Sequence, residues 1–161
     1  MFRAVDKTML LQEDFAKVYE LCESFLRDSY YAQEDASKID LSRYIVDLNL
    51  LRYARKKIEA EVRAVDIVSI EVHLMEHAHQ TDRYLLTLNA KVTLDYGGSF
   101  GERTQLLVKN IDGRLVIADW YTFKGRSGFD DVFRGPQGIT NPTVWEDVDK
   151  AKELLRKVGV K

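Results

Sequence analysis

The most constraining feature of this chain is a strict alternation of apolar and polar side chains between Arg83 and Tyr96. Apolar side chains occupy every second position, from Tyr84 through Leu88 to Leu94. Because successive side chains of a β-strand point to opposite faces, this pattern predicts a strand in a sheet with one covered face. The segment is long against the usual length of about five to six residues, so we expect the strand to bend strongly or to span the whole domain.

Two segments ahead of this strand have the period of an amphipathic helix. The first runs from Glu13 to Tyr31 and the second from Leu41 to Val62, with an expected break near Asp47–Asn49. A shorter alternation at Val68–Leu74 predicts a strand that comes before the long one. Helices followed by a run of strands predict the α+β class, with N-terminal helices packed on an antiparallel sheet.

A hairpin is predicted at Asp112-Gly113, because this dipeptide lies between two apolar runs in VKNIDGRLVIADWYTF. With Ile111 opposite Arg114, a ladder without interruption fixes the register of both strands. The pairs expected on the face toward the helices are Val108 with Ile117, Leu106 with Asp119 and Thr104 with Tyr121. The pairs expected on the outer face are Lys109 with Val116, Leu107 with Ala118 and Gln105 with Trp120. Asp119 is therefore expected to point inward.

The C-terminal part of the chain is expected to be a loop followed by a helix. Residues 124–142 are rich in glycine and contain both prolines, which predicts a long ordered loop. Thr143–Glu146 matches a capping box that would open a last helix ending at Gly159. A length of 161 residues predicts a single domain, 1–161, with a core of about residues 10–124 and a C-terminal loop and helix at 125–161.

Charge and composition exclude some classes of partner. The net charge is −2 with acids and bases interspersed, so we expect no nucleic acid partner and no membrane partner. The single cysteine, Cys22, lies on an apolar helix stripe and predicts a buried hydrophobe. No signal peptide is recognised at the N-terminus. The expected location is cytoplasmic, with an extracytoplasmic fragment that has lost its leader as the alternative.

Two stretches carry a resemblance to a known superfamily: FLRDSYYA at the end of the first predicted helix and KNIDGRLVIADWY at the hairpin. With the order of elements over residues 10–124, they resemble the nuclear transport factor 2-like superfamily, which includes ketosteroid isomerase-like and polyketide cyclase-like proteins. The resemblance implies a bacterial protein whose strongly curved four-stranded sheet wraps the N-terminal helices into a cone. The superfamily contains enzymes, small-molecule binders and adaptors, so it implies no single function. A fainter resemblance is to the domain ahead of amidase domains in envelope proteins of Gram-positive bacteria.

Asp119 is the most informative single residue, because a buried carboxylate is costly unless a donor or a cation pairs with it. Three roles are open: an acceptor of structural hydrogen bonds, a ligand anchor, or an acid in catalysis. The resemblance implies an acid and a tyrosine in the cone, but the isomerase motif does not map residue by residue. No catalytic residue, metal or cofactor is expected. The predicted ligand-binding residues are Asp119, Tyr121, Tyr30 and Tyr84.

Two further clusters have alternative interpretations. His73, His77 and His79 would share one face of a continuous strand, and we expect a polar approach to a hairpin, with a metal site as the alternative. The segment GRSGFDDVFRG carries Arg126 and Arg134 and predicts an ordinary loop. Its alternative is a contact with an anion or with a partner.

The outer face of the predicted hairpin carries an apolar patch, which either the C-terminal helix or a second copy of the chain must cover. The patch residues are Leu107, Val116, Ala118 and Trp120. The function expected is a non-enzymatic small-ligand-binding or protein-interaction module, dimeric through this patch, with a small apolar ligand in the cone. The alternatives are a cofactor-independent isomerase, dehydratase or cyclase, and an accessory domain of a larger bacterial envelope protein.

Overall fold

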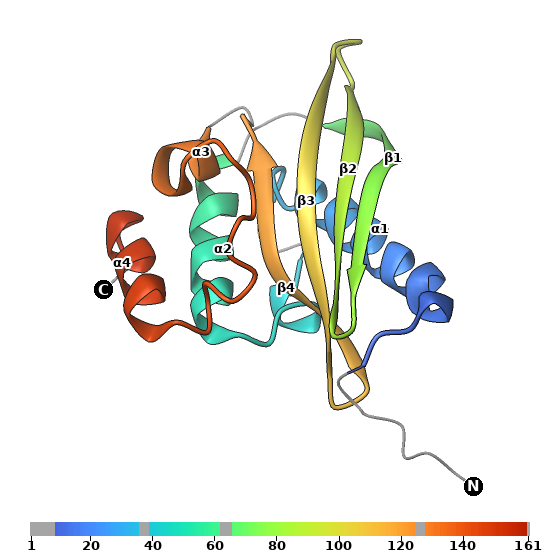
Figure 1. Cartoon of the computed structure of the whole chain (residues 1–161). Coiled ribbons are helices and arrows are strands. Elements are labelled where there is room, and N and C mark those ends of the chain that lie inside the picture. The colour runs from blue at the N-terminus through green and yellow to red at the C-terminus, as the bar shows by residue number, and fades with distance from the viewer. Residues whose placement is uncertain (1–8, 36–38, 62–65, 125–127, 161) are drawn as a thin grey trace, which may run out of the picture.

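A computed structural model of the chain describes residues 9–35, 39–61, 66–124 and 128–160. Helices come before and after a four-stranded antiparallel sheet (Figure 1), which confirms the α+β class. The strong curvature and the cone stay predictions. The helices are α1 (Phe15–Tyr31), α2 (Leu48–Glu61), α3 (Phe129–Arg134) and α4 (Val148–Lys157). The strands are β1 (Ile67–Gln80), β2 (Arg83–Leu94), β3 (Ser99–Ile111) and β4 (Arg114–Phe123).

Helices α1 and α2 form where the apolar period predicted them. The core face of α1 carries Val18, Cys22 and Phe25, which are fully buried. The predicted break in the second segment is confirmed, because α2 begins at Leu48 and the Asp47 carboxylate accepts a hydrogen bond from the backbone N–H of Leu50 at 2.9 Å. Val62, the expected end of that segment, lies outside the described residues.

The strands follow one another in the order β1-β2-β3-β4, each antiparallel to the next. The hairpin at Asp112-Gly113 is confirmed, with positive φ values of 52° and 88° at these two residues. A type I′ turn requires positive φ at both central positions, and Gly113 adopts it at no steric cost. The Asn110 side chain accepts a hydrogen bond from the Gly113 N–H at 2.8 Å, which adds to the turn.

The predicted register holds next to the turn and fails after Ala118. Val108 pairs with Ile117 as expected, but Leu107 pairs with Asp119, which leaves Ala118 as the extra residue of a β-bulge. The bulge shifts every later residue of β4 to the opposite face. The expectation that Asp119 points inward, on the face that carries Val108 and Ile117, is therefore wrong. The observed later pairs are Leu106 with Trp120, Gln105 with Tyr121 and Thr104 with Thr122.

A second irregularity divides β1 at Met75. Leu74 pairs with Leu88 and Glu76 pairs with Thr87, so Met75 is an extra residue of β1 without a partner on β2. The expectation of one shared face for the histidines is therefore wrong. His73 lies opposite Asn89, whereas His79 lies opposite Tyr84, a residue of the buried face of β2.

The segment after β4 contains a helix that the sequence did not predict. Within the expected loop, α3 lies between Gly128 and Gly135, whose φ values are +60° and +83°. The predicted capping box is wrong as a helix start. The carbonyl of Thr143 accepts hydrogen bonds that close a separate turn, and Asp147 caps α4 by accepting from the Lys150 N–H at 3.2 Å.

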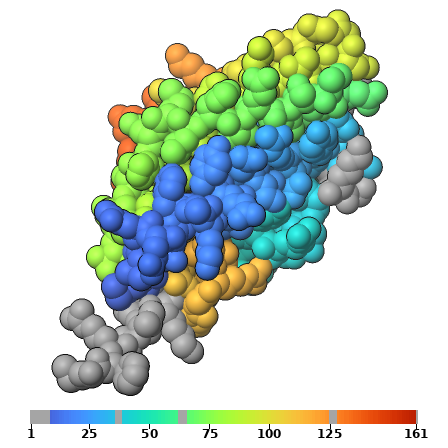
Figure 2. All heavy atoms as spheres, turned by 90° about the vertical axis from the view of Figure 1, so that its right-hand side faces the viewer, coloured from blue at the N-terminus to red at the C-terminus, as the bar shows by residue number. Residues whose placement is uncertain are grey.

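The helices lie in two groups around the sheet. Helix α1 packs on β1, β2 and β4, and Figure 2 shows α1 and β1 running side by side on one side of the molecule. Helices α2, α3 and α4 gather beside β4, with α4 packed on α2 (Figure 1). In the main core, Trp120 of β4 meets Phe25 of α1 edge to face, with ring centroids 5.0 Å apart. The C-terminal segment is thus packed against both α2 and the edge strand of the sheet.

Candidate functional site

The carboxylate of Asp119 is buried and fully engaged by the C-terminal segment. Its two oxygens accept hydrogen bonds from Arg134 Nη1 at 3.0 Å and Nη2 at 2.6 Å. The Trp145 indole N–H adds a third at 2.8 Å, and the backbone N–H of Trp120 a fourth at 2.8 Å. These bonds offset the cost of burying the charge. Burial opposes the charge on Arg134, but the attraction of Asp119 raises the pKa of Arg134 above its ordinary value.

A second buried ion pair fixes α3 to the body of the protein. Lys57 of α2 and Asp130 of α3 lie 2.5 Å apart, and both side chains are fully buried. Asp130 also accepts from the Tyr53 hydroxyl at 2.7 Å and from the Thr122 N–H at 2.8 Å. Burial and the Asp130 carboxylate raise the pKa of Tyr53. Helix α3, although only six residues long, is therefore held in one position from two sides.

The four predicted ligand-binding residues do not converge. Asp119 and Tyr121 lie on the face of β4 covered by the C-terminal segment, and the Tyr121 hydroxyl donates to Asp131 at 2.6 Å. Tyr30 and Tyr84 lie among the core residues on the side of the N-terminal helices. The Tyr30 hydroxyl donates to Glu102 at 2.9 Å, and the Tyr84 hydroxyl donates to the Leu11 carbonyl at 3.1 Å. Each has its own partner and its own surroundings.

The outer apolar patch, for which the C-terminal helix and a second copy were the two expected covers, is divided and largely buried within one chain. The bulge turns Trp120 into the main core and leaves Ala118 at the irregular position of the ladder. Leu107 and Val116 stay on the outer face, where they are 1% and 2% exposed. Trp145 lies beside Val116 and is itself buried. Leu107, Val116 and Trp120 are therefore not available for a dimer, because they are buried within the single chain, Trp120 in the main core and Val116 beside Trp145 of the C-terminal segment.

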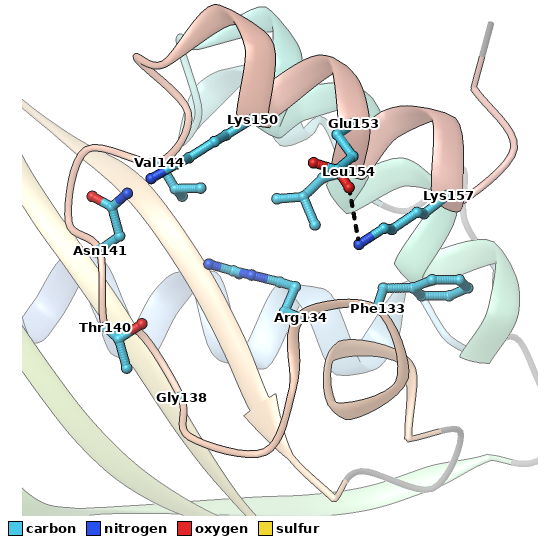
Figure 3. Close-up of a pocket in the computed structure, with 10 residues that line it drawn as sticks. All are labelled: Phe133, Arg134, Gly138, Thr140, Asn141, Val144, Lys150, Glu153, Leu154 and Lys157. Atoms are coloured by element: carbon cyan, nitrogen blue, oxygen red, sulfur yellow. Dashed lines mark ion pairs between the residues drawn. The ribbon is translucent and has the colours of Figure 1, made fainter.

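A groove opens between α3, residues 138–144 and α4 (Figure 3). Its volume is about 310 Å³, at the small end of the range of about 300–1,000 Å³ that is usual for ligand pockets. Apolar and polar side chains share the lining. The lining residues are Phe133, Arg134, Gly138, Thr140, Asn141, Val144, Lys150, Glu153, Leu154 and Lys157.

Arg134 forms the rigid part of this groove. Only 8% of its side chain is exposed, and it extends from α3 toward residues 140 and 141 (Figure 3). The rings of Tyr53, Tyr121 and Trp145 surround its guanidinium at 5.5–5.8 Å. A guanidinium has five N–H groups, and three of them donate to Asp119 and to the Trp120 carbonyl. Two N–H groups are left without a partner among the described residues.

Three more donors lie on the same side of the groove. The side-chain oxygen of Asn141 accepts from the N–H and the hydroxyl of Thr143 at 3.1 and 3.0 Å, which fixes the amide orientation. The amide nitrogen of Asn141 then points away from Thr143, toward Lys150 (Figure 3). The Thr140 hydroxyl points toward Arg134 in the same view. Arg134, Thr140, Asn141 and Lys150 therefore present donors to one space.

The groove is positively charged. Arg134, Lys150 and Lys157 are basic, and Glu153 is the one acid among the described residues of the lining. Glu153 lies 3.5 Å from Lys157 on α4, so these two charges offset each other. Asp119 offsets Arg134 from behind the groove. Lys150 keeps a positive charge with no ion pair among the described residues, although the whole chain has a net charge of −2.

Sequence reasoning named one residue of this groove and missed the others. Arg134 belongs to GRSGFDDVFRG, for which an anion contact was the alternative to an ordinary loop, whereas Arg126 of the same motif lies outside the described residues. The segment Asn141-Pro-Thr143 carries the signal of an Asx turn, which the structure contains. That signal predicts a local turn but does not show that the free amide group faces a groove.

The three histidines have separate neighbours. His73 lies 3.9 Å from Glu71, and the His77 ring lies 4.7 Å from the Phe15 ring. His79 stacks on the Tyr84 ring at 4.2 Å and lies 2.6 Å from the Leu10 carbonyl. In the parts of the chain that the structure describes, no three histidine, cysteine, aspartate or glutamate side chains form a group suited to a metal ion. The alternative of a histidine metal site gains no support.

A buried acidic cluster lies on the inner side of the sheet. Tyr30 and Glu102 share the 2.9 Å hydrogen bond described above, and Gln33 donates to Glu61 at 3.2 Å. Burial, followed by the charge of Glu102 and the hydrogen bond to it, raises the pKa of Tyr30 well above its ordinary value. The phenol therefore keeps its proton at neutral pH and acts as a donor.

Comparison with known proteins gives no family for this arrangement: no family model, no curated protein and no solved structure matches the chain. Among the described residues, no helix has both the length and the apolar character needed to cross a membrane. The groove and the acidic cluster are therefore the features from which a function can be inferred.

Proposed function

We propose that the protein is a non-enzymatic small-molecule-binding module and that its site is the groove between α3, residues 138–144 and α4. The observation that carries this proposal is the position of Arg134. Its side chain is almost fully buried, is fixed by Asp119 and three aromatic rings, and keeps two N–H groups in a lining with other donors. A preorganised donor costs little entropy when a ligand binds, which is how a small site gains affinity.

The C-terminal segment supplies this entire site. Among the described residues, those that line the groove lie between Phe133 and Lys157, outside residues 10–124, which carry the resemblance to the nuclear transport factor 2-like superfamily. Membership of that superfamily is itself a hypothesis. On our proposal the helices and the sheet form the scaffold, and the two buried ion pairs hold the binding segment against it.

Native mass spectrometry of the purified protein tests the proposal. We expect an additional mass that disappears under denaturing conditions. Leu154→Trp should remove that mass by filling the groove, whereas Val132→Trp should keep it, because Val132 lies on α3 outside the lining and is 73% exposed. A bound mass that survives Leu154→Trp would place the site elsewhere and contradict the proposal. The same spectrum reports the oligomeric state.

A second candidate is a cofactor-independent isomerase, dehydratase or cyclase. The sequence assigned Asp119 as its acid, but on the inner face of the sheet, where the cone was expected, the acid–tyrosine pair is Glu102 with Tyr30, at 2.9 Å. A protonated phenol beside a carboxylate is suited to proton transfer. This function requires that Glu102→Gln abolishes turnover while the unfolding midpoint stays the same. A variant that loses stability and activity together would make the pair structural.

The other expectations stay hypotheses with simple tests. An accessory domain of a larger envelope protein would have further coding sequence next to this chain, which the flanking gene sequence shows directly. A cytoplasmic location is tested by fractionating cells that express the protein. A homodimer would have to use residues other than Leu107, Val116 and Trp120, because these are buried in the single chain.

A further inference from the structure

We infer that the ligand of the groove is a small organic anion, with a carboxylate or phosphate group bound by Arg134, Thr140, Asn141 and Lys150. This inference rests on the proposed binding function and specifies its ligand class. Carboxylate and phosphate groups both carry a compact negative charge with several acceptor oxygens, which is the chemistry that these donors would bind.

The polar side of the groove consists almost entirely of hydrogen-bond donors. The two remaining N–H groups of Arg134, the amide nitrogen of Asn141 and the ammonium group of Lys150 are all donors. The Thr140 hydroxyl can donate as well. The acceptor side of the Asn141 amide is already occupied by Thr143. A ligand group that meets this set must supply acceptors, and an anion supplies the most per atom.

The charges around the groove favour a ligand with one negative charge. Arg134 is neutralised by Asp119 on its buried side, so it contributes fixed donors rather than an uncompensated charge. Lys150, with no ion pair among the described residues, is left as the positive charge of the site. One negative charge on the ligand would therefore balance the groove. A neutral ligand would leave Lys150 solvated but unpaired.

The size and the apolar lining of the groove limit the body of the ligand. A groove of about 310 Å³ has the size of a small-molecule site and is too small for a folded partner. Val144 and Leu154 supply apolar surface within the same lining, and Figure 3 shows them between the donors and the Glu153–Lys157 pair. The ligand should therefore have one anionic end and a short apolar body.

Isothermal titration of the full chain with benzoate, phenyl phosphate and neutral benzyl alcohol tests the ligand class. We expect at least one anion to bind and benzyl alcohol to bind at least tenfold more weakly. The affinity for the anion should fall as salt is raised. Comparing the affinities for benzoate and phenyl phosphate shows whether the groove prefers a carboxylate or a phosphate group. Absence of binding by both anions at millimolar concentration would overturn the inference.

Asn141→Asp is the sharpest variant, because it keeps both hydrogen bonds from Thr143 and replaces the donor nitrogen by a charged oxygen. We expect at least tenfold weaker binding of the anion. Lys150→Gln should weaken binding severalfold, whereas the same substitution at the neighbouring exposed Lys152, which does not line the groove, should have no effect. Unchanged affinity in both groove variants would overturn the inference.

The two proposals fail in different ways. If benzyl alcohol binds as tightly as the anions and Leu154→Trp abolishes its binding, the groove is a binding site but not an anion site. If Leu154→Trp changes neither the bound mass nor the affinity of any probe, the groove is not the binding site at all. In that case the proposed function fails together with the ligand class.

Discussion

Arg134 holds the carboxylate of Asp119 through both of its terminal nitrogens, at 3.0 and 2.6 Å. The two residues come from α3 and β4, and the indole of Trp145 completes the cluster from the segment before α4. The pair therefore has two consequences. It fastens the C-terminal segment over the outer face of the sheet, and it fixes the donors of the groove.

Breaking this pair from one side should be strongly destabilising. Asp119→Asn leaves the Arg134 guanidinium buried without its counter-charge, and we expect a loss of about 3–5 kcal/mol in the free energy of unfolding. Replacing both residues at once, as Asp119→Leu with Arg134→Met, should cost less than Asp119→Asn alone, because no charge is left unpaired. Urea unfolding of the three proteins measures this. A double variant less stable than the single one would contradict the argument.

Deletion of Ala118 should be tolerated. Ala118 is the extra residue of the bulge, so a ladder without it keeps Asp119 opposite Leu107 and Trp120 opposite Leu106. We expect a cooperative unfolding transition, with a loss within about 3 kcal/mol, the range of ordinary single changes. Deletion of Val116 is the control, because it removes a paired residue and reverses the faces next to the turn. Equal damage from both deletions would show that the bulge itself is essential.

Gly138→Ala should distort the groove. Gly138 has φ +77°, and a Cβ atom there would lie 2.5 Å from Gln105 Oε1 and 2.6 Å from the Phe123 ring. Residues 138–144 must then move away from the sheet, which should lower both stability and ligand affinity. Gly113→Ala has the same positive-φ strain, of about 1–3 kcal/mol, without any atom within 4 Å. Thermal unfolding should show a larger loss for Gly138→Ala, and equal losses would contradict the steric argument.

Stability should fall as pH rises above about 10. The raised pKa of Tyr53 means that the folded protein keeps a proton which the unfolded chain releases above its ordinary pKa of 10.0. Each such group removes up to about 1.4 kcal/mol of stability per pH unit, the full slope being reached once the unfolded tyrosine is ionised. Tyr53→Phe should therefore reduce the slope of unfolding free energy against pH by that amount. Parallel slopes for the two proteins between pH 10 and 11 would contradict the assignment.

Helices α1 and α2, the strands and the hairpin were predictable because their signals are local. The alternation after Arg83 requires a half-buried strand whatever surrounds it, and Asp112-Gly113 supplies the backbone conformation of a two-residue turn. The break before Leu48 follows from Asp47, whose carboxylate caps the helix that begins there. Each of these features depends on residues a few positions apart.

The face of the sheet on which a side chain lies could not be predicted for residues that follow a β-bulge. An alternating sequence is consistent with either continuous pairing or one extra residue, and nothing within β4 marks Ala118 as the extra one. The choice depends on distant partners: Trp120 packs against Phe25, and Asp119 pairs with Arg134. The Met75 bulge separates the histidines for the same kind of reason.

The sequence by itself determined the α+β class, the order of α1, α2, the four strands and the last helix, and the presence of one carboxylate that required a partner. The tertiary structure decided which partner that carboxylate found, which face of the sheet it joined and where a groove opened. Local backbone preferences act over a few residues, so they can be inferred from the sequence. The buried pair between Asp119 and Arg134 forms only when helix, strand and loop are packed together. Packing removes water from both groups, and the attraction between opposite charges is stronger in these less polar surroundings.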